Sequence, residues 1–198
     1  TLDKDSLLIS VTAACGPLVY RGGQFEADYS ENAFVCVPEA NLIKRNILTF
    51  EGDKISAKHA YDDQEFIAST DEGFRPVNLF NGPDGSMYIV DMHRGIIQDK
   101  AYLSPYLLQL LAKRKLDTIV GMGRILKVTN QSKAKHEVQN LSTFSTKQLV
   151  GTLNHENGWV RDRVQQILIQ KNDKSAISFL KELIETSENP LAQLHALY

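Results

Sequence analysis

Polar side chains suited to chemistry gather on either side of a short apolar segment. Asp91, His93 and Arg94 follow that segment, and Arg75 and Asn78 precede it. A histidine or an aspartate can accept a proton from a hydroxyl group, and an arginine can pair with a carboxylate through two hydrogen bonds. We therefore take His93 and Asp91 as candidate catalytic residues, and Arg75, Asn78 and Arg94 as candidate cofactor-binding residues.

The same residues also have a purely structural interpretation. Asp91 would cap a turn, Arg94 would pair with it at the surface, and His93 would face solvent in a loop. Taken one at a time, the residues fit this interpretation better, because a motif without known geometry does not establish a site. Both interpretations stay open at this point.

A β-hairpin is the element that would position these residues. Residues 76–79 and 87–90 are short apolar segments with strand-forming residues, and residues 81–85 (NGPDG) between them are turn formers. Asn81, Asp84 and Gly85 do not have the spacing of a calcium-binding loop, so we interpret them as a turn. The sequence predicts no metal site.

Short strands surround this hairpin in the first two thirds of the chain. The predicted strands are 7–11, 18–20, 33–37, 41–49, 55–60, 66–69 and 124–128. FVCVPEANLIKR, from Phe34, resembles MYIVDMHRGIIQ, from Met87, and each consists of an apolar strand, a polar corner and a second apolar strand. A period of about 40–50 residues is typical of β-propeller blades, and a simple β-sandwich is the alternative.

Helical periodicity replaces the strand pattern towards the end of the chain. Pro105 begins an apolar pattern of helical spacing, a predicted insertion over about 104–116. Ser145 and Asp173 are expected helix caps, and residues 159–170 carry one apolar face. The fold prediction is therefore a mixed two-part chain: antiparallel β-sheets of propeller-blade type over 1–130, a linker over 131–142, and all-α HEAT-like helical repeats over 143–198.

Composition narrows the classes of function. The formal net charge is −2 without a long basic run, which argues against nucleic acid as the main partner. No apolar segment has transmembrane length. The chain begins with Thr1 and has no signal peptide, so we interpret it as a piece of a longer protein. Cys15 and Cys36 form either a disulfide of an exported protein or a pair of small buried apolar residues.

Four segments carry a resemblance to a known family. They are AACGPLVYRGGQF, NAFVCVPEANLIKRN, FRPVNLFNGPDGSMYIVDMHRGIIQ and GRILKV. They resemble bacterial membrane-associated or periplasmic dehydrogenases of the L-sorbosone or glucose dehydrogenase type, which are also described as haem-binding proteins. HENGWVRDRVQQILIQKND is similar to the start of that family's helical repeats. The sequence departs from the family at Gly73 and His93, where the family has a large residue such as tryptophan and a tyrosine.

The resemblance implies a function for the parent protein. The family's layout is a propeller, then HEAT-like repeats, then a cytochrome c domain, so this chain would hold the last blades and the first repeats. The parent would be a periplasmic or exported quinoprotein-like sugar or aldose dehydrogenase with pyrroloquinoline quinone (PQQ) and haem c. Its partners would be a sugar or similar small molecule, the remaining blades and the cytochrome c domain. The chain has no CxxCH motif, so it would not attach haem c itself, and the fragment alone is expected to be inactive. The alternative is a non-catalytic module that binds carbohydrate or protein partners.

Overall fold

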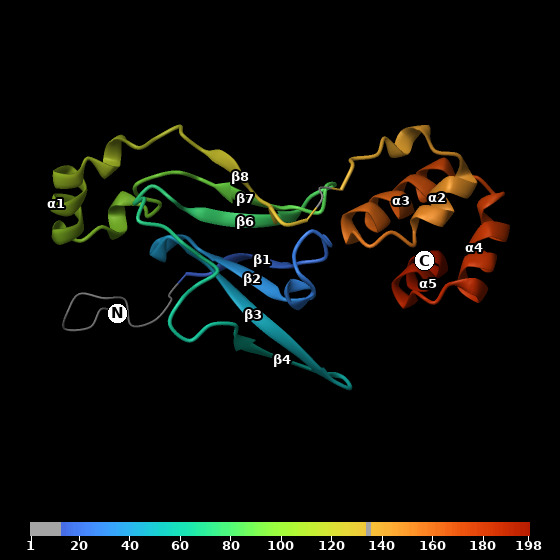
Figure 1. Cartoon of the computed structure of the whole chain (residues 1–198). Helices are drawn as coiled ribbons and strands as arrows, with labels where there is room; N and C mark the ends of the chain where they lie inside the picture. Colours follow the sequence, from blue (N-terminus) through green and yellow to red (C-terminus); the bar gives the residue numbers. More distant parts are fainter. Residues whose placement is uncertain (1–12, 134–135) are drawn as a thin grey trace. The chain divides into compact units, whose positions relative to one another are not determined.

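The computed structural model describes residues 13–133 and 136–198, and it divides into two compact units (Figure 1). The first unit comprises the described residues up to Tyr20, together with Glu31–Phe80 and Tyr88–Val128. The second comprises Arg21–Ser30, Asn81–Met87 and Thr129–Tyr198. The predicted strand over 7–11 and part of the predicted linker lie outside the described residues.

One sheet of the first unit is an antiparallel meander. Its order is β1-β2-β3-β4, and β5 pairs with β3 on the side that β4 also uses. Apolar residues on one side of β2 and β3 are fully buried, among them Phe34, Cys36 and Ile43. The strands are β1 (Cys15–Val19), β2 (Ala33–Val37), β3 (Leu42–Glu51), β4 (Lys54–His59) and β5 (Ile67–Ala68). They confirm the prediction of antiparallel β-structure in this part of the chain.

A second sheet has the order β6-β7-β8. Its strands are β6 (Pro76–Asn81), β7 (Met87–Asp91) and β8 (Arg124–Val128). A short loop joins the neighbouring strands β6 and β7, which confirms the predicted hairpin. Met87 and Ile89 are buried, as expected for a strand with alternating faces. The helix α1 (Pro105–Arg114) lies between β7 and β8 in the sequence and begins at Ser104, whose side chain accepts a hydrogen bond from the Leu107 N–H.

The resemblance between the segments starting at Phe34 and Met87 does not extend to their structure. After β2, a turn through Asn41 in the left-handed conformation returns the chain into β3. After β7, residues 95–98 form no strand. The physical reason is that the carbonyl groups of Arg94 and Gly95 bind the Arg75 guanidinium, so this segment is held by a side chain instead of by a sheet.

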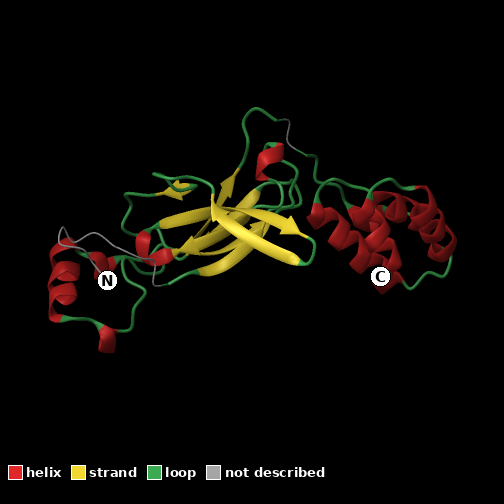
Figure 2. Cartoon of the chain, turned by 90° about the horizontal axis from the view of Figure 1, so that it is seen from below, coloured by secondary structure: helices red, strands yellow, loops and turns green. Residues whose placement is uncertain are grey.

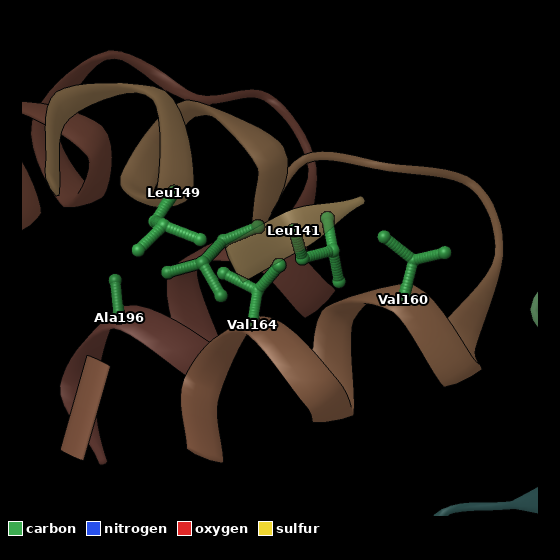
Figure 3. Close-up of a cluster of buried hydrophobic side chains, with 6 residues drawn as sticks. Leu141, Leu149, Val160, Val164 and Ala196 are labelled. Carbon is green, nitrogen blue, oxygen red and sulfur yellow. The ribbon is translucent and has the colours of Figure 1, made fainter. Parts of the chain in front are cut away.

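The second unit contains the remaining α-helices, shown in red in Figure 2. They are α2 (Thr146–Thr152), α3 (Gly158–Lys171), α4 (Ala176–Thr186) and α5 (Pro190–Leu197). Their core is a cluster of buried residues from the segment before α2 and from α2, α3 and α5 (Figure 3): Leu141, Leu149, Leu153, Val160, Val164 and Ala196. Trp159, Ile167 and Leu168 pack against this cluster, which confirms the apolar face predicted for residues 159–170.

The two predicted caps have different outcomes. Ser145 caps α2 in a capping box with Gln148, as predicted. The expectation that Asp173 caps α4 is wrong, because α4 begins after Ser175. Asp173 instead accepts hydrogen bonds from the N–H and hydroxyl of Ser175, which close a turn before the helix.

Two loops complete the second unit, and both come from the strand-rich part of the sequence. The Gly158 N–H donates to the Arg21 carbonyl at 2.8 Å. The buried Asn157 side chain donates to the carbonyls of Gly82 and Pro83 at 2.9 and 3.2 Å, and accepts from the Trp159 N–H that begins α3. The turn of the β6–β7 hairpin is thus part of the helical unit, which the sequence pattern did not indicate. Among the described residues, no helix is long and apolar enough to span a membrane.

Candidate functional site

Asp91 is a buried carboxylate at the end of β7, with 1% of its surface exposed. Its Oδ1 accepts from the backbone N–H groups of Arg75 (2.7 Å) and His93 (2.8 Å). Its Oδ2 accepts from Nε of Arg124 at 2.8 Å. These three donors satisfy a group that would otherwise be expensive to bury. Asp91 therefore fixes the backbone on both sides of the candidate site.

His93 is positioned by an unusual backbone conformation. Its φ angle is +40°, a left-handed region that non-glycine residues seldom adopt. The hydrogen bond from its N–H to Asp91 stabilises this turn. His93 Nε2 lies 3.1 Å from Oδ2 of Asp71, and only 17% of the His93 side chain is exposed. Strained residues of this kind concentrate at functional sites.

Asp71 is the second carboxylate of the site. The Gly73 N–H donates to its Oδ1 at 2.9 Å, and Arg124 Nη2 donates to its Oδ2 at 3.1 Å. The Gly73 backbone, followed by His93 and Arg124, lowers the pKa of Asp71 below its ordinary value. A side chain at Gly73 would bring its Cβ to 3.0 Å from His93 Nε2, so the absence of a side chain there leaves room for the imidazole ring.

Arg124 joins the two carboxylates into one network. It comes from β8, which neighbours β7 in the sheet, so its guanidinium reaches Asp91 through Nε and Asp71 through Nη2. The arrangement is a histidine–aspartate pair held in place by an arginine and a buried second aspartate. We name Asp71, Asp91, His93 and Arg124 the Asp–His cluster. Chemically, it can accept a proton and hold a polar, hydroxyl-bearing molecule.

Comparison with models of known protein families shows to which family the chain belongs. The model for the domain of unknown function DUF7133 matches residues 3–132, about two thirds of the chain. The chain belongs to the DUF7133 family. No curated protein and no solved structure matches the chain. All members of the Asp–His cluster lie within the DUF7133 domain.

Arg75 has a defined role in the DUF7133 domain. Its guanidinium donates to four backbone carbonyls, those of Arg94 (3.1 Å), Pro38 (2.7 Å), Glu39 (3.3 Å) and Gly95 (2.8 Å). Burial lowers its pKa below the ordinary value for arginine. Arg75 therefore ties the corner after β2 to the corner after β7.

A cavity of about 280 Å³ opens beside Arg75. Its polar wall includes Glu39, Asn41 and Glu72, and Glu72 also forms an ion pair with Arg114. Ile96, Ile97, Leu107, Leu110, Leu111 and Leu116 form its apolar side. Its volume is just below the usual range for small-molecule sites, which begins at about 300 Å³. Within residues 13–133 and 136–198, no group of three His, Cys, Asp or Glu residues is placed to hold a metal ion.

The other candidate residues lie apart from the Asp–His cluster's hydrogen bonds. Asn78 Oδ1 accepts from the Leu79 N–H. Arg94 is exposed, and the expectation that its side chain pairs with Asp91 is wrong. Arg124 occupies that place because β8 lies next to β7, whereas the left-handed turn at His93 leaves Arg94 at the surface.

Cys15 and Cys36 stand opposite one another in the β1–β2 register, and both are free thiols in the structure. Burial raises the pKa of Cys36 to about 12, and the pKa of Cys15 is also raised by burial. The disulfide stays a prediction, and the register is the arrangement that such a bridge would need.

Sequence reasoning missed Asp71 and Arg124. Asp71 lies in the acidic segment 70–73, where a bend is the obvious interpretation, and Arg124 begins an alternating strand. The one local signal is the Asp-x-Gly spacing of Asp71 and Gly73, which permits a side-chain-to-backbone hydrogen bond. Nothing near Arg124 in the sequence indicates its partners.

Proposed function

We propose that this chain is part of a quinoprotein-like sugar or aldose dehydrogenase that passes electrons to a haem domain outside the chain. We further propose that His93 accepts the proton of the substrate hydroxyl. The observation that carries the proposal is the hydrogen bond between His93 Nε2 and Asp71, in a site where a buried aspartate and an arginine fix both partners.

The roles of the residues follow from this geometry. The lowered pKa of Asp71 keeps its carboxylate ionised, so it favours the tautomer in which His93 Nε2 carries the proton. Nδ1 of that tautomer has a lone pair that can accept a proton from a hydroxyl group. Arg124 stabilises Asp71, and Asp91 holds the His93 backbone in its left-handed turn.

Two of the arginines near the Asp–His cluster already have partners that would compete with the carboxylates of PQQ. The Arg75 guanidinium is occupied by backbone carbonyls, and the Arg124 guanidinium is occupied by Asp91 and Asp71. Arg94, the third candidate, is exposed. A quinone would therefore have to be held mainly by residues outside this set, and the role proposed for His93 does not depend on how it is held.

The fold is consistent with the family's layout. A meander of four antiparallel strands, as in β1 to β4, is the usual architecture of one propeller blade. Short helices joined by short connections, as in α2 to α5, are typical of HEAT-like repeats. These features support the proposal that the chain holds blades and first repeats of a periplasmic or exported protein, with the other blades and a cytochrome c domain elsewhere in the parent.

The test is dye-linked oxidation of a panel of sugars by the full-length protein, with and without added PQQ. His93→Asn should lower kcat by about 10²- to 10⁴-fold, the usual contribution of a general base. Asparagine tolerates the left-handed backbone, so the turn should persist. His59→Asn, on the exposed strand β4, is the matched control and should leave kcat unchanged. Absence of sugar oxidation by the quinone-loaded parent, or full activity of His93→Asn, would contradict the proposal.

The second candidate is a non-catalytic module that binds carbohydrate or protein partners. The observation that favours it is that Arg75 donates to four backbone carbonyls beside a partly apolar cavity. In that case, calorimetry should detect sugar binding that Leu110→Trp, which would fill the cavity, abolishes. No sugar should then be oxidised, and His93→Asn should leave the affinity unchanged.

A further inference from the structure

The distal half of the β3–β4 hairpin is an arm of two strands. β2 pairs with β3 only as far as Asn46, and β5 pairs only with its first residues. Among the strands that the structure describes, residues 47–51 of β3 pair only with residues 54–58 of β4. Figure 1 shows the hairpin continuing beyond the other strands of its sheet. An isolated two-stranded hairpin is only marginally stable in water, so an arm of this kind gains from a further strand.

The arm has one apolar face, and that face is uncovered. Phe50 stands opposite Ile55, and Leu48 stands opposite Ala57. Phe50 and Ile55 are 54% and 66% exposed. Strand alternation puts both pairs on one face of the arm. The other face carries Lys54, which stands opposite Glu51, and Lys58, which stands opposite Ile47.

The outer edge of β4 is the free edge of the sheet. β4 stands at the end of the strand order, and β3 is its one partner among the strands that the structure describes. Because two residues connect the strands, Glu51 and Lys54 form the hydrogen-bonded pair that closes the hairpin. Alternation then directs the N–H and C=O groups of Ile55 and Ala57 towards the free edge.

This edge is basic. β4 has the sequence KISAKH, with Lys54 and Lys58 and no acidic residue, and all of its residues are exposed. An added strand would have β4 as its immediate neighbour, so its side chains would meet those lysines on one face and Ile55 and Ala57 on the other. Opposite charges across neighbouring strands stabilise a sheet, and like charges destabilise it.

We propose that β4 accepts an extended segment of another protein as an added strand, and that this segment alternates apolar and acidic residues. Its backbone pairs with the free edge at Ile55 and Ala57. Its apolar residues extend the face formed by Phe50 and Ile55, and its carboxylates stand beside Lys54 and Lys58. None of these residues belongs to the Asp–His cluster, so the peptide test does not depend on the role proposed for His93.

The charges favour such a segment over a second copy of the chain. Pairing of β4 with β4 of another copy would bring four lysines together without a carboxylate on either strand. Lysines on an edge strand also protect proteins against unwanted pairing. The exposed Phe50–Ile55 pair argues against protection as their whole role, because a protected edge has no need of a large apolar face beside it.

The experiment measures fluorescence anisotropy of labelled peptides with the whole chain. The probe is a capped hexapeptide of alternating glutamate and valine. Its controls are the lysine–valine peptide and a glutamate–valine peptide with N-methyl groups on alternate residues, which cannot complete the ladder. Only the first peptide should bind. Lys54→Glu with Lys58→Glu should weaken its binding about tenfold and transfer the preference to the lysine peptide. Phe50→Ser with Ile55→Ser should also weaken binding, while circular dichroism stays unchanged because both side chains are exposed.

Three outcomes would overturn the inference. Equal binding of the N-methylated and unmodified acidic peptides would exclude strand addition. A dimer in sedimentation that Phe50→Ser with Ile55→Ser disrupts would identify a second copy as the occupant. Failure of all the peptides to bind at millimolar concentration would leave the lysines as edge protection alone.

Discussion

The β3–β4 and β6–β7 hairpins each have a glycine with positive φ in the turn, but their surroundings are opposite. The β3–β4 turn has Gly52 at φ +63°, and the β6–β7 turn has Gly85 at φ +79°. Nothing lies within 4 Å of the position that a Cβ would take at Gly52. At Gly85 the same position lies 2.5 Å from the Gly22 carbonyl oxygen. The backbone conformation of a turn is thus set locally, whereas the tolerance of a turn to change is set by what surrounds it.

The buried β6–β7 turn makes hydrogen bonds within itself and with the start of α3. Ser86 and Asp84 are almost fully buried and bond to each other, and Gly82 donates to the Ser86 carbonyl. Asn157 from the start of α3 then binds the carbonyls of Gly82 and Pro83. The exposed turn of β3–β4 is surrounded by exposed residues. One hairpin is anchored by its tip, and the other offers its tip and edge to solvent.

The largest expected effect is that of Gly85→Ala. Left-handed strain of about 1–2 kcal/mol and overpacking of about 1–3 kcal/mol against Gly22 should together lower the free energy of unfolding by about 2–5 kcal/mol. Gly52→Ala is the matched control and should lower it by about 1 kcal/mol, since it has the strain without the contact. Urea unfolding of both variants measures the difference. Equal losses would show that the turn at Gly85 is not packed as described.

Asn157→Ala should lower the free energy of unfolding by about 2–3 kcal/mol. The change removes a helix cap, worth about 1 kcal/mol, and leaves the buried Gly82 carbonyl and the partly buried Pro83 carbonyl without their donor. Asn189→Ala is the control, because Asn189 caps α5 through the same bond to the Leu191 N–H. It should cost about 1 kcal/mol. If the two variants lose the same stability, the anchoring of the β6–β7 turn contributes nothing.

Insertion of two glycines into each turn tests whether the exposed β3–β4 turn tolerates a longer loop better than the buried β6–β7 turn. Between Gly52 and Asp53, the insertion should change the free energy of unfolding by less than about 1 kcal/mol, because a longer surface loop costs little entropy. Between Asp84 and Gly85, it should cost about 2 kcal/mol, because it separates Asp84 from Ser86 and displaces the carbonyls that Asn157 binds. Thermal unfolding of the two insertion variants measures this difference in stability. A tolerated insertion at Asp84 would mean that the tip is not anchored.

The sequence predicted local structure well and spatial partners poorly, for a physical reason. The strands 33–37 and 124–128 and the cap at Ser145 depend on neighbouring residues, so a local pattern contains the information. The pairing of Arg124 with Asp91 depends on β8 lying beside β7, and the burial of Gly85 depends on a loop more than 60 residues earlier in the chain. The hydrophobic periodicity of the sequence indicates neither the Arg124–Asp91 pairing nor the burial of Gly85.

In the candidate site, too, the sequence indicated residues near a predicted strand but not their partners in space. Asp91 and His93 were identifiable because they follow a buried strand. Arg75 was identifiable as an arginine near them, but its use as a donor to four carbonyls depends on corners far apart in the sequence. Asp71, which binds the His93 ring, was not among the candidate residues of the sequence analysis. The sequence located part of the candidate site but did not reveal which charges are already paired.

The smallest expected effect comes from removing one methyl group from each hairpin. Ile89 on β7 is 1% exposed, and Ile55 on β4 is 66% exposed. Ile89→Val should lower the free energy of unfolding by about 0.5–1.5 kcal/mol, since the methyl group leaves a small cavity in a packed sheet face. Ile55→Val should change it by less than about 0.5 kcal/mol, since valine is an equally good strand former and the side chain is in water. Both are measured by urea unfolding of the isolated chain. A loss at Ile55 as large as that at Ile89 would mean that the face formed by Phe50 and Ile55 is already covered in solution, so the arm would have no free surface for an added strand.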